Sequence, residues 1–513
     1  MELDDAVCYR ALLARDARYD GRFFTCVKTT GIYCRPVCPA RPPKLANCTF
    51  VPSAAAAQEA GFRPCLRCRP ESSPDLDAWR GTSATVSRAL KLIEGGALDE
   101  ADVESLAERL DIGARQLRRL FRRHLGAAPV TVAQTRRVLL AKQLIHQTQL
   151  GMTEVALASG FGSLRRFNET FQRLYRRPPS ELRRGANGKA PVSGISLLLP
   201  YRPPYDWQSM RRFLADRAIP GFESITPESY ERVIEINRKV GSIHVTHAPG
   251  ESALRAVVRF PQLNCLPTII ARTRRLFDLG AEPLAIAAAL QSDPILGPLV
   301  RARPGLRLPG AWDGFEIAVR AVLGQQISLR EATRLAGRLV SMLGEQVGEA
   351  VGQPGLTRAF PRPDSLTASA LAGLGVPRSR IECLANVAAT AAAQPDLFQP
   401  CRDLAASVAR LREIPGVGEW TAQYIAMRGV GESDAFMASD VGVQRALAVN
   451  GRRPSTAEVL ARAQSWRPWR AYALLHLWMG EAHSGAATTP DRSRKIRLGG
   501  RQDLQDRLAV GGG

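Results

Sequence analysis

Four cysteines near the start of the chain stand in two close pairs that could bind a metal ion. Three residues separate Cys34 from Cys38, two separate Cys65 from Cys68, and 26 residues lie between the pairs. Two such pairs supply the four thiolates that a tetrahedral Zn²⁺ needs. On spacing alone the site could be a closed structural clip. It could also be reactive, because four thiolates on one divalent cation leave surplus negative charge that can attack an electrophilic carbon.

Basic residues accompany the cluster and the chain as a whole. Those nearest to the cysteines in the sequence are Arg35, Arg41, Lys44, Arg63, Arg67 and Arg69. The 513 residues include 70 Lys+Arg against 48 Asp+Glu, which gives a formal net charge of +22. A polyanion is therefore the expected partner, and the basic side chains would bring a phosphate backbone close to a reactive sulfur.

The remaining composition excludes other classes of protein. Ten cysteines in a chain of this length are too few for a disulfide scaffold. No stretch is typical of a signal peptide or a membrane-spanning helix, so we expect a cytoplasmic protein with no membrane partner. Cys48 receives no role. The scattered cysteines are expected to be small buried apolar residues: Cys8, Cys26, Cys265, Cys383 and Cys401.

The sequence around the cysteine pairs resembles the N-terminal zinc domain of bacterial Ada adaptive-response proteins. The stretches "RYDGRFFTCVKTTGIYCRPVCPARPP" and "GFRPCLRCRPE" carry this resemblance over about the first 70 residues. It implies that Cys34 accepts a methyl group from a methylphosphotriester in DNA while it remains a zinc ligand. Cys38, Cys65 and Cys68 would be the supporting ligands. A purely structural zinc site is the alternative.

Two stretches farther along have the helix, tight turn, helix pattern of a DNA reader. They are "VESLAERLDIGARQLRRLFRRHLG" and "TEVALASGFGSLRRFNETFQRLYRRPPSELRR". Residues 109–184 hold 16 Lys+Arg and four Asp+Glu, so the charge coincides with candidate recognition helices that start near Ala114 and Ser163. An ordinary solvated basic face is the alternative. The side chains expected to pack inward are Leu106, Ala107, Leu110, Leu117 and Phe121.

The same segment, residues 83–184, resembles the DNA-binding domain of AraC-type transcription regulators, which follows the zinc domain in Ada proteins. The residues expected to contact bases or phosphates are Arg115, Arg118, Arg119, Ser163, Arg165 and Arg166.

The C-terminal half contains a hairpin signal and a separate carboxylate. In "LREIPGVGEWTAQYIAMRG" two glycines permit a tight turn between helices, whose backbone N–H groups can hold a phosphate without reading sequence. In "DAFMASDVGVQRAL" Asp440 begins an apolar helical stretch, where its carboxylate could lie in a cleft. A helix N-cap is the alternative role for Asp440.

These stretches, with "AVRAVLGQQIS" and "WRPWRAYALLHLW", resemble the helix-hairpin-helix DNA glycosylases of the 3-methyladenine glycosylase II (AlkA) type over residues 195–485. The resemblance implies that Asp440 is the catalytic carboxylate. Trp420, Tyr424 and Trp478 would line the base pocket, although core packing is their alternative role. The DNA-contacting residues would be Pro415, Gly416, Val417, Gly418, Gln325 and Gln326.

Three features refine this expectation. Trp420 occupies the position at which lyase-type relatives carry a Schiff-base lysine, so the enzyme should be monofunctional. No cysteine follows Cys401, so we expect no iron–sulfur cluster. Gln325 and Gln326 stand where the type enzyme has an apolar wedge beside a glutamine. The sequence therefore does not identify the residue that opens the duplex. His476 is expected to be a core histidine.

The predicted fold is multidomain α+β. We expect a small zinc domain at 1–75 and an all-α domain with two helix-turn-helix units at 82–184. An antiparallel-sheet α+β domain follows at 195–305, with strands at "SLLLP", "YERVIEI", "SIHVTHA" and "LRAVVRF". An all-α helix-hairpin-helix core is expected at 306–485 and a disordered tail at 486–513. "RPESSPDLD" and "GANGKAPVSG" are read as linkers.

The sequence therefore indicates an alkylation-response protein that joins a methyl-accepting zinc sensor, a transcription-regulator domain and a glycosylase for alkylated bases of the 3-methyladenine type. Double-stranded DNA and RNA polymerase are the expected partners, and one Zn²⁺ the expected cofactor. The alternative is a damage-sensing transcription factor whose C-terminal half only clamps damaged DNA. The Pro-Cys-His-Arg motif of a second Ada-type methyltransferase is missing, so O6-alkylguanine repair is not expected.

Overall fold

The structure of the chain, a computed structural model, describes residues 4–74, 84–183, 194–348 and 355–487. The second predicted linker falls almost wholly outside these ranges. The first is different, because its opening residues are part of the fold: Pro70–Ser72 form a 3₁₀ turn, and Glu71 is buried in an ion pair with Lys142. The interpretation of residues 69–74 as a linker was wrong, since Pro, Ser and charged residues resemble a linker in composition whether or not they find partners.

The zinc domain is a small mixed sheet with short helices. Its strands are ordered β3-β1-β2-β4, with β2 and β4 parallel and the other pairs antiparallel. The two cysteine pairs lie at the ends of β2 and β4. The elements are α1 (Asp5–Leu13), β1 (Phe24–Val27), β2 (Ile32–Cys34), β3 (Cys48–Val51), α2 (Ala54–Glu59) and β4 (Arg63–Pro64).

The second domain is all-helical, as predicted. The five side chains expected to pack inward are fully buried in one apolar cluster. The predicted recognition helices are α6 and α9, and Ser163 caps α9 by accepting a hydrogen bond from the Arg166 N–H. The helices are α3 (Ala84–Glu94), α4 (Ala97–Glu100), α5 (Val103–Glu108), α6 (Ala114–Leu125), α7 (Pro129–Gln147), α8 (Met152–Ala158) and α9 (Leu164–Tyr175).

The third domain contains the predicted antiparallel sheet, in the order β5-β9-β8-β7-β6. Alternating apolar side chains such as Leu197, paired with Ala256 across β5 and β9, face a buried cluster shared with the second domain. The elements are β5 (Ile195–Pro200), α10 (Trp207–Ala215), β6 (Glu223–Ile225), β7 (Ser229–Ile236), β8 (Lys239–Ala248) and β9 (Ala253–Arg259), followed by α11 (Leu266–Leu276), α12 (Pro283–Leu290) and α13 (Leu296–Ala302).

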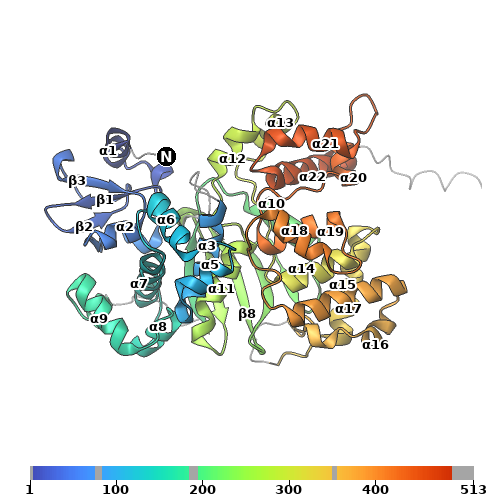
Figure 1. Cartoon of the computed structure of the whole chain (residues 1–513), viewed down its shortest axis with the longest axis horizontal. Helices are drawn as coiled ribbons and strands as arrows, with labels where there is room; N and C mark the ends of the chain where they lie inside the picture. Colours follow the sequence, from blue (N-terminus) through green and yellow to red (C-terminus); the bar gives the residue numbers. More distant parts are fainter. Residues whose placement is uncertain (1–3, 75–83, 184–193, 349–354, 488–513) are drawn as a thin grey trace, which may run out of the picture.

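The helical core forms the other end of the molecule in Figure 1. Helix α19 continues directly into a fully buried π-helix, η10, an element that often marks functional sites. The elements are α14 (Gly314–Leu323), α15 (Leu329–Leu343), α16 (Ala368–Leu371), α17 (Arg378–Ala393), α18 (Leu404–Arg412), α19 (Glu419–Ile425), η10 (Ala426–Val430), α20 (Val441–Ala446), α21 (Thr456–Ala463) and α22 (Arg470–Ala487).

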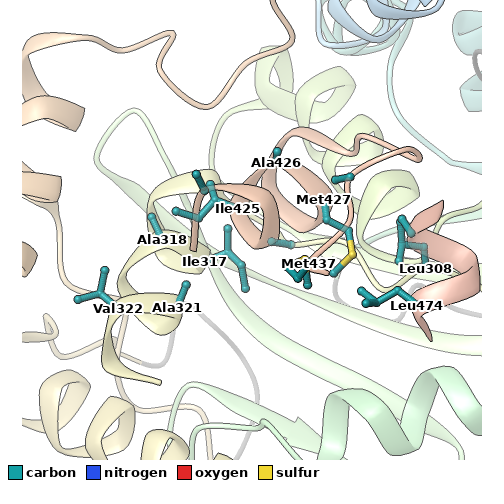
Figure 2. Close-up of a cluster of buried hydrophobic side chains, with 14 of the residues drawn as sticks. Leu308, Ile317, Ala318, Ala321, Val322, Ile425, Ala426, Met427, Met437 and Leu474 are labelled. Carbon is teal, nitrogen blue, oxygen red and sulfur yellow. The ribbon is translucent and has the colours of Figure 1, made fainter. Parts of the chain in front are cut away.

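The interior of this core is apolar where η10 crosses α14. Figure 2 shows Ile425 beside side chains of α14 such as Ile317, and Met427 of η10 beside Met437, all within one apolar cluster. The η10 segment is therefore fixed by close packing on its inner side. The predicted combination of a zinc domain, a helix-turn-helix domain, a sheet domain and a helical core is confirmed.

Several smaller expectations can be compared with the fold. Helix α22 continues to Ala487, so the predicted tail begins too early, and residues 488–513 lie outside the described ranges. Of the scattered cysteines, Cys401 is only half-buried, whereas the other four are buried. His476 is a buried core histidine, as expected. Within the described residues no helix is both long and apolar enough to cross a membrane.

Candidate functional site

A cavity of about 780 Å³ opens between the sheet domain and the helical core, and Asp440 lies in its wall. The three aromatic residues predicted for a base pocket, Trp420, Tyr424 and Trp478, line the same cavity. They come from α19 and α22, and Asp440 stands at the start of α20. The fold thus brings together four predicted residues from three separate helices.

Three donors hold the Asp440 carboxylate. Oδ1 accepts the indole N–H of Trp478 at 2.9 Å and the backbone N–H of Val443 at 3.0 Å. Oδ2 accepts the indole N–H of Trp420 at 3.1 Å. The bond from Val443 makes Asp440 the N-cap of α20. Both roles considered for Asp440 are therefore compatible: the cap fixes the backbone, and the two indoles fix the carboxylate within the cavity.

The aromatic rings offer a flat surface to a ligand. Trp420 and Tyr424 are four residues apart on α19, so their rings stack at a centroid distance of 5.2 Å and an interplanar angle of 10°. Both rings and that of Trp478 are partly buried and pack on the apolar core at one edge. Core packing and pocket lining therefore occur together, and the exposed ring faces can stack on a planar group.

Two arginines in the same wall were not foreseen. Arg428 donates to the Tyr424 hydroxyl at 2.8 Å and to the carbonyl oxygens of Pro309 and Gly310 at 2.9 Å. Burial raises the pKa of Tyr424, but Arg428 and Arg217 outweigh it, so the pKa lies below its usual value. Burial lowers the pKa of the Arg217 guanidinium.

These guanidinium groups oppose the binding of a cationic base in the cavity. Cation–π attraction favours a cationic base, but Arg428 and Arg217 in the same wall repel one. A spacing of four residues from Tyr424 could have indicated Arg428. No local signal indicates Arg217, which follows α10 in another domain.

The predicted hairpin lies between α18 and α19. Pro415, Gly416 and Gly418 are exposed, whereas Val417 is buried and its N–H donates to the Ile414 carbonyl at 3.0 Å. Val417 therefore anchors the turn, and the glycine N–H groups are the candidate phosphate donors. Gly416 has a φ of +93°, and a Cβ there would lie 2.6 Å from the Cys383 Sγ, so only glycine fits.

The two glutamines considered for DNA contact differ in their surroundings. The Gln325 amide donates to the Gly416 carbonyl and to the Thr421 Oγ1, each at 3.2 Å, so it supports the hairpin. Gln326 is exposed and has a left-handed backbone, with φ at 58°. Gln326 is therefore the glutamine that is free to reach toward a duplex, and its contact with DNA stays a prediction.

The second candidate site is the cysteine cluster. The sulfur atoms of Cys34, Cys38, Cys65 and Cys68 all lie within 4.8 Å of one another. A tetrahedral zinc site with Zn–S bonds of about 2.3 Å separates its sulfurs by about 3.8 Å. Four thiol donors at this spacing fit Zn²⁺.

The four sulfurs are not equivalent. Backbone N–H groups donate to Cys65 from Arg67 at 3.3 Å and to Cys68 from Arg35 at 3.4 Å. Among the described residues no backbone donor reaches the Cys34 sulfur. Cys34 is also the only partly exposed member of the four, which are otherwise buried. Its sulfur therefore combines solvent access with the lack of a backbone donor among the described residues, as a nucleophile requires.

The basic side chains near the cluster separate into two groups. Arg35 is committed to the fold, because it pairs with Asp20 and donates to the Cys68 carbonyl at 3.1 Å. Arg41, Lys44, Arg67 and Arg69 are exposed, and Arg63 is partly so. The interpretation of Arg35 as a phosphate contact was therefore wrong, since a buried carboxylate already satisfies it.

The helix-turn-helix residues predicted to read DNA are exposed on α6 and α9. Arg118 pairs with Glu104 at 2.6 Å and Arg165 with Glu169 at 2.8 Å, and both pairs are solvent-exposed. Such surface pairs contribute little and readily give way to phosphate. The predicted readers, all exposed, are Arg115, Arg118, Arg119, Ser163, Arg165 and Arg166.

Three family models match the chain. They are the metal binding domain of Ada at residues 7–71, a helix-turn-helix domain at 106–185 and the AlkA N-terminal domain at 196–313. Their order along the chain is that of the domains described above.

Relatives match both the whole chain and its parts. The "Probable bifunctional transcriptional activator/DNA repair enzyme AlkA" of Mycobacterium tuberculosis is 40% identical over 481 residues, covering 93% of this chain and 96% of that protein. The DNA-3-methyladenine glycosylase 2 of Escherichia coli is 35% identical over 55% of this chain and 96% of its own length. The bifunctional transcriptional activator/DNA repair enzyme AdaA of Bacillus subtilis is 31% identical over 34% of this chain and 81% of its own.

Proposed function

Because the chain belongs to the family of bifunctional transcriptional activator/DNA repair enzymes of the AlkA type, we propose a reaction for each of its two sites. At Asp440 the protein hydrolyses the N-glycosidic bond of alkylated bases, of the 3-methyladenine type, in DNA. At Cys34 it takes a methyl group from a DNA methylphosphotriester. The helix-turn-helix domain converts that modification into transcriptional activation.

The geometry around Asp440 suits glycosidic hydrolysis. The damaged nucleotide leaves the base stack and its base enters the cavity beside Trp420 and Tyr424. The bond from C1′ to the base nitrogen breaks, and its electron pair leaves with the base. Asp440 stabilises the positive charge that develops on the sugar, while a water adds to C1′ and releases a proton. No lysine is available at the position of Trp420, so the abasic site is left uncut.

The observation that carries this proposal is the carboxylate held by two indole N–H groups in the cavity wall. The test is Asp440→Asn on duplex DNA that carries 3-methyladenine. Asparagine retains the N-cap, so the fold should survive, while base release should fall by about a hundredfold or more because the charge is lost.

Asp403→Asn is a matched control, because Asp403 caps α18 through the Ala406 N–H at 2.7 Å outside the cavity. It should release base at the wild-type rate. If the wild-type protein binds the damaged DNA but releases no base, the alternative is favoured, namely a transcription factor whose C-terminal half only clamps damaged DNA.

The cysteine cluster suits stoichiometric methyl transfer. The four sulfurs of Cys34, Cys38, Cys65 and Cys68 would hold Zn²⁺, and the bound ion would keep them deprotonated near neutral pH. The Cys34 sulfur attacks the methyl carbon, a C–S bond forms and the C–O bond breaks, and the phosphate leaves as a diester anion. Cys34 then carries one negative charge fewer, so repulsion between the domain and DNA phosphates decreases. Tighter DNA binding by the methylated protein follows.

Intact-mass measurement after exposure to DNA with methylphosphotriesters tests the sensor. We expect one added methyl group, mapped to Cys34 by peptide digestion. An unmodified wild type, together with loss of the fold in Cys34→Ala, would instead make the zinc site structural.

The remaining parts of the proposal follow from DNA as the substrate. We place the protein in the cytoplasm, with RNA polymerase as a partner of the DNA-bound activator. We assign 1–75 to the sensor, 82–184 to the regulator, and 195–305 with 306–485 to the glycosylase. The absence of an iron–sulfur cluster stays a prediction.

A further inference from the structure

A buried ion pair joins the regulator domain to the glycosylase core. Arg88 on α3 forms two hydrogen bonds with the Glu432 carboxylate, from Nε at 2.9 Å and from Nη2 at 2.8 Å. The two side chains are only 9% and 10% exposed. The remaining Arg88 nitrogen, Nη1, donates to the Arg402 carbonyl at 3.2 Å. A bidentate pair with so little solvent access holds a fixed geometry.

The surrounding contacts fix α3 against the helical core and against α11 of the sheet domain. Lys91, one turn after Arg88, donates to the Gly431 carbonyl at 2.7 Å. Thr268 of α11 donates to the Gly95 carbonyl at 3.4 Å, just after the end of α3. Figure 1 shows α3 and α11 lying side by side between the two ends of the molecule. The regulator domain therefore forms hydrogen bonds with two consecutive residues of the glycosylase, Gly431 and Glu432.

Those two residues belong to the segment that forms the base pocket. Gly431 directly follows η10, which carries Arg428, and Arg428 holds the Tyr424 hydroxyl. On the other side, the chain runs from Glu432 through the buried residues 435–438 to Asp440. The inner side of η10 is packed on α14 (Figure 2), so the side that faces α3 is the one a second domain can influence.

We propose that Arg88, a residue of the regulator domain, is a positioning residue of the glycosylase. It acts through Glu432 to hold the segment 426–440, and with it Arg428, Tyr424 and Asp440, in the arrangement that excision needs. The effect on excision rests on the proposed function of Asp440. The positioning itself does not, because it can be measured without any reaction.

Because the pair is buried, we expect the loss of Arg88 to slow excision. Removing the guanidinium leaves the Glu432 carboxylate buried without its partner, and the segment must move to let water reach it. Both ends of that segment contribute to the pocket wall, so the displacement reaches the catalytic groups. Coupling of this kind, carried by a packed element, typically changes a rate by several-fold to tenfold.

The experiment compares wild type with Arg88→Gln in the full-length protein. Base release is measured in single turnover at saturating enzyme, and amide hydrogen exchange is measured for peptides that cover residues 426–440. We expect Arg88→Gln to lower the single-turnover rate about tenfold and to speed exchange in this segment. The exchanged-charge variant Arg88→Glu with Glu432→Arg should bring both measurements most of the way back to wild type.

Arg402→Gln is the matched control. Arg402 lies at the same interface, but its side chain pairs with Asp111 at 3.3 Å on the exposed surface. It should change neither measurement. The inference would be overturned if Arg88→Gln showed the hydrogen exchange and the rate of base release of the wild type. It would also be overturned if Arg88→Gln released base slowly and the double variant with the two charges swapped did not restore the rate. A wild type that releases no base refutes the proposed function, while hydrogen exchange still decides the positioning.

Discussion

The Asp440 carboxylate depends on two indole rings for its orientation. Trp478→Phe keeps an aromatic face in the cavity but removes the N–H that donates to Oδ1 at 2.9 Å. A hydrogen bond to a charged group contributes about 1.5–3 kcal/mol, so base release should slow by about tenfold or more. Single-turnover kinetics on 3-methyladenine DNA measure this effect.

Trp466→Phe is a matched comparison, because the Trp466 indole donates to the Asp293 carboxylate, also at 2.9 Å, but away from the cavity. It should lower the unfolding midpoint and leave the rate of base release unchanged. Equal rates in Trp478→Phe and wild type would mean that the carboxylate does not need this indole.

The stability of the folded protein should depend on pH through the buried His476. Burial, and then the charge of Arg303, lower the pKa of His476 from its usual 6.5 to about 4. Between these values the unfolded chain binds a proton that the folded protein does not, so the free energy of unfolding falls as pH drops from about 6.5 to 4. The loss should reach about 3 kcal/mol. In His476→Leu this contribution to the pH dependence should vanish. Urea unfolding of both proteins at about pH 7 and about pH 4.5, near the two ends of this range, tests the prediction.

At the scale of elements, the hairpin between α18 and α19 offers a contrast between two glycines. In Gly416→Ala the new Cβ meets the Cys383 Sγ at 2.6 Å and the backbone has a positive φ, so the turn must distort. We expect affinity for undamaged duplex to fall about tenfold, the equivalent of about 1.4 kcal/mol.

Gly418→Ala is the control for the hairpin, because no atom lies within 4 Å of the added Cβ and its φ is −84°. Fluorescence anisotropy with a short labelled duplex compares the two variants. Equal affinities would show that the shape of the turn does not matter for binding.

The elements also show which features a sequence can reveal. Short, β-branched runs bounded by Pro, Gly or Ser predicted the strands near 196–200 and 254–260. Helical spacing of apolar residues predicted α6 and α9, because burial of one face imposes a period. Arg217 and the Arg88–Glu432 pair could not be predicted, since long-range contacts leave no local pattern. Glu71 was misread for the same reason. Asp440 and the aromatic residues were found through motif order rather than periodicity, and their roles stay predictions.

At the scale of the whole molecule, a buried lysine connects the sensor to the regulator. The Lys142 ammonium on α7 pairs with Glu71 at 2.8 Å and donates to the carbonyl of Cys65 at 3.2 Å. Both charged side chains have 2% exposure or less. Lys142→Met should destabilise the protein by about 3–5 kcal/mol, because Glu71 is left buried and unpaired.

Adding Glu71→Gln to Lys142→Met should restore most of that stability, because no unpaired charge then remains. Thermal unfolding of the four proteins in the cycle measures the coupling. A chelator challenge adds a second readout, since the variant with Lys142→Met alone should release zinc faster. Additive effects of the two substitutions would mean that the pair does not join the domains.

The presence of Cys34 and Asp440 in one chain has a consequence for how long a response lasts. Under the proposed function, Cys34 forms a thioether that nothing in its own site reverses, whereas Asp440 turns over repeatedly. Each chain therefore keeps a permanent record of one damage event while it continues to repair others. The signal can end only as marked chains are degraded or diluted among daughter cells, so the memory of an alkylation episode is set by growth rate rather than by enzyme kinetics.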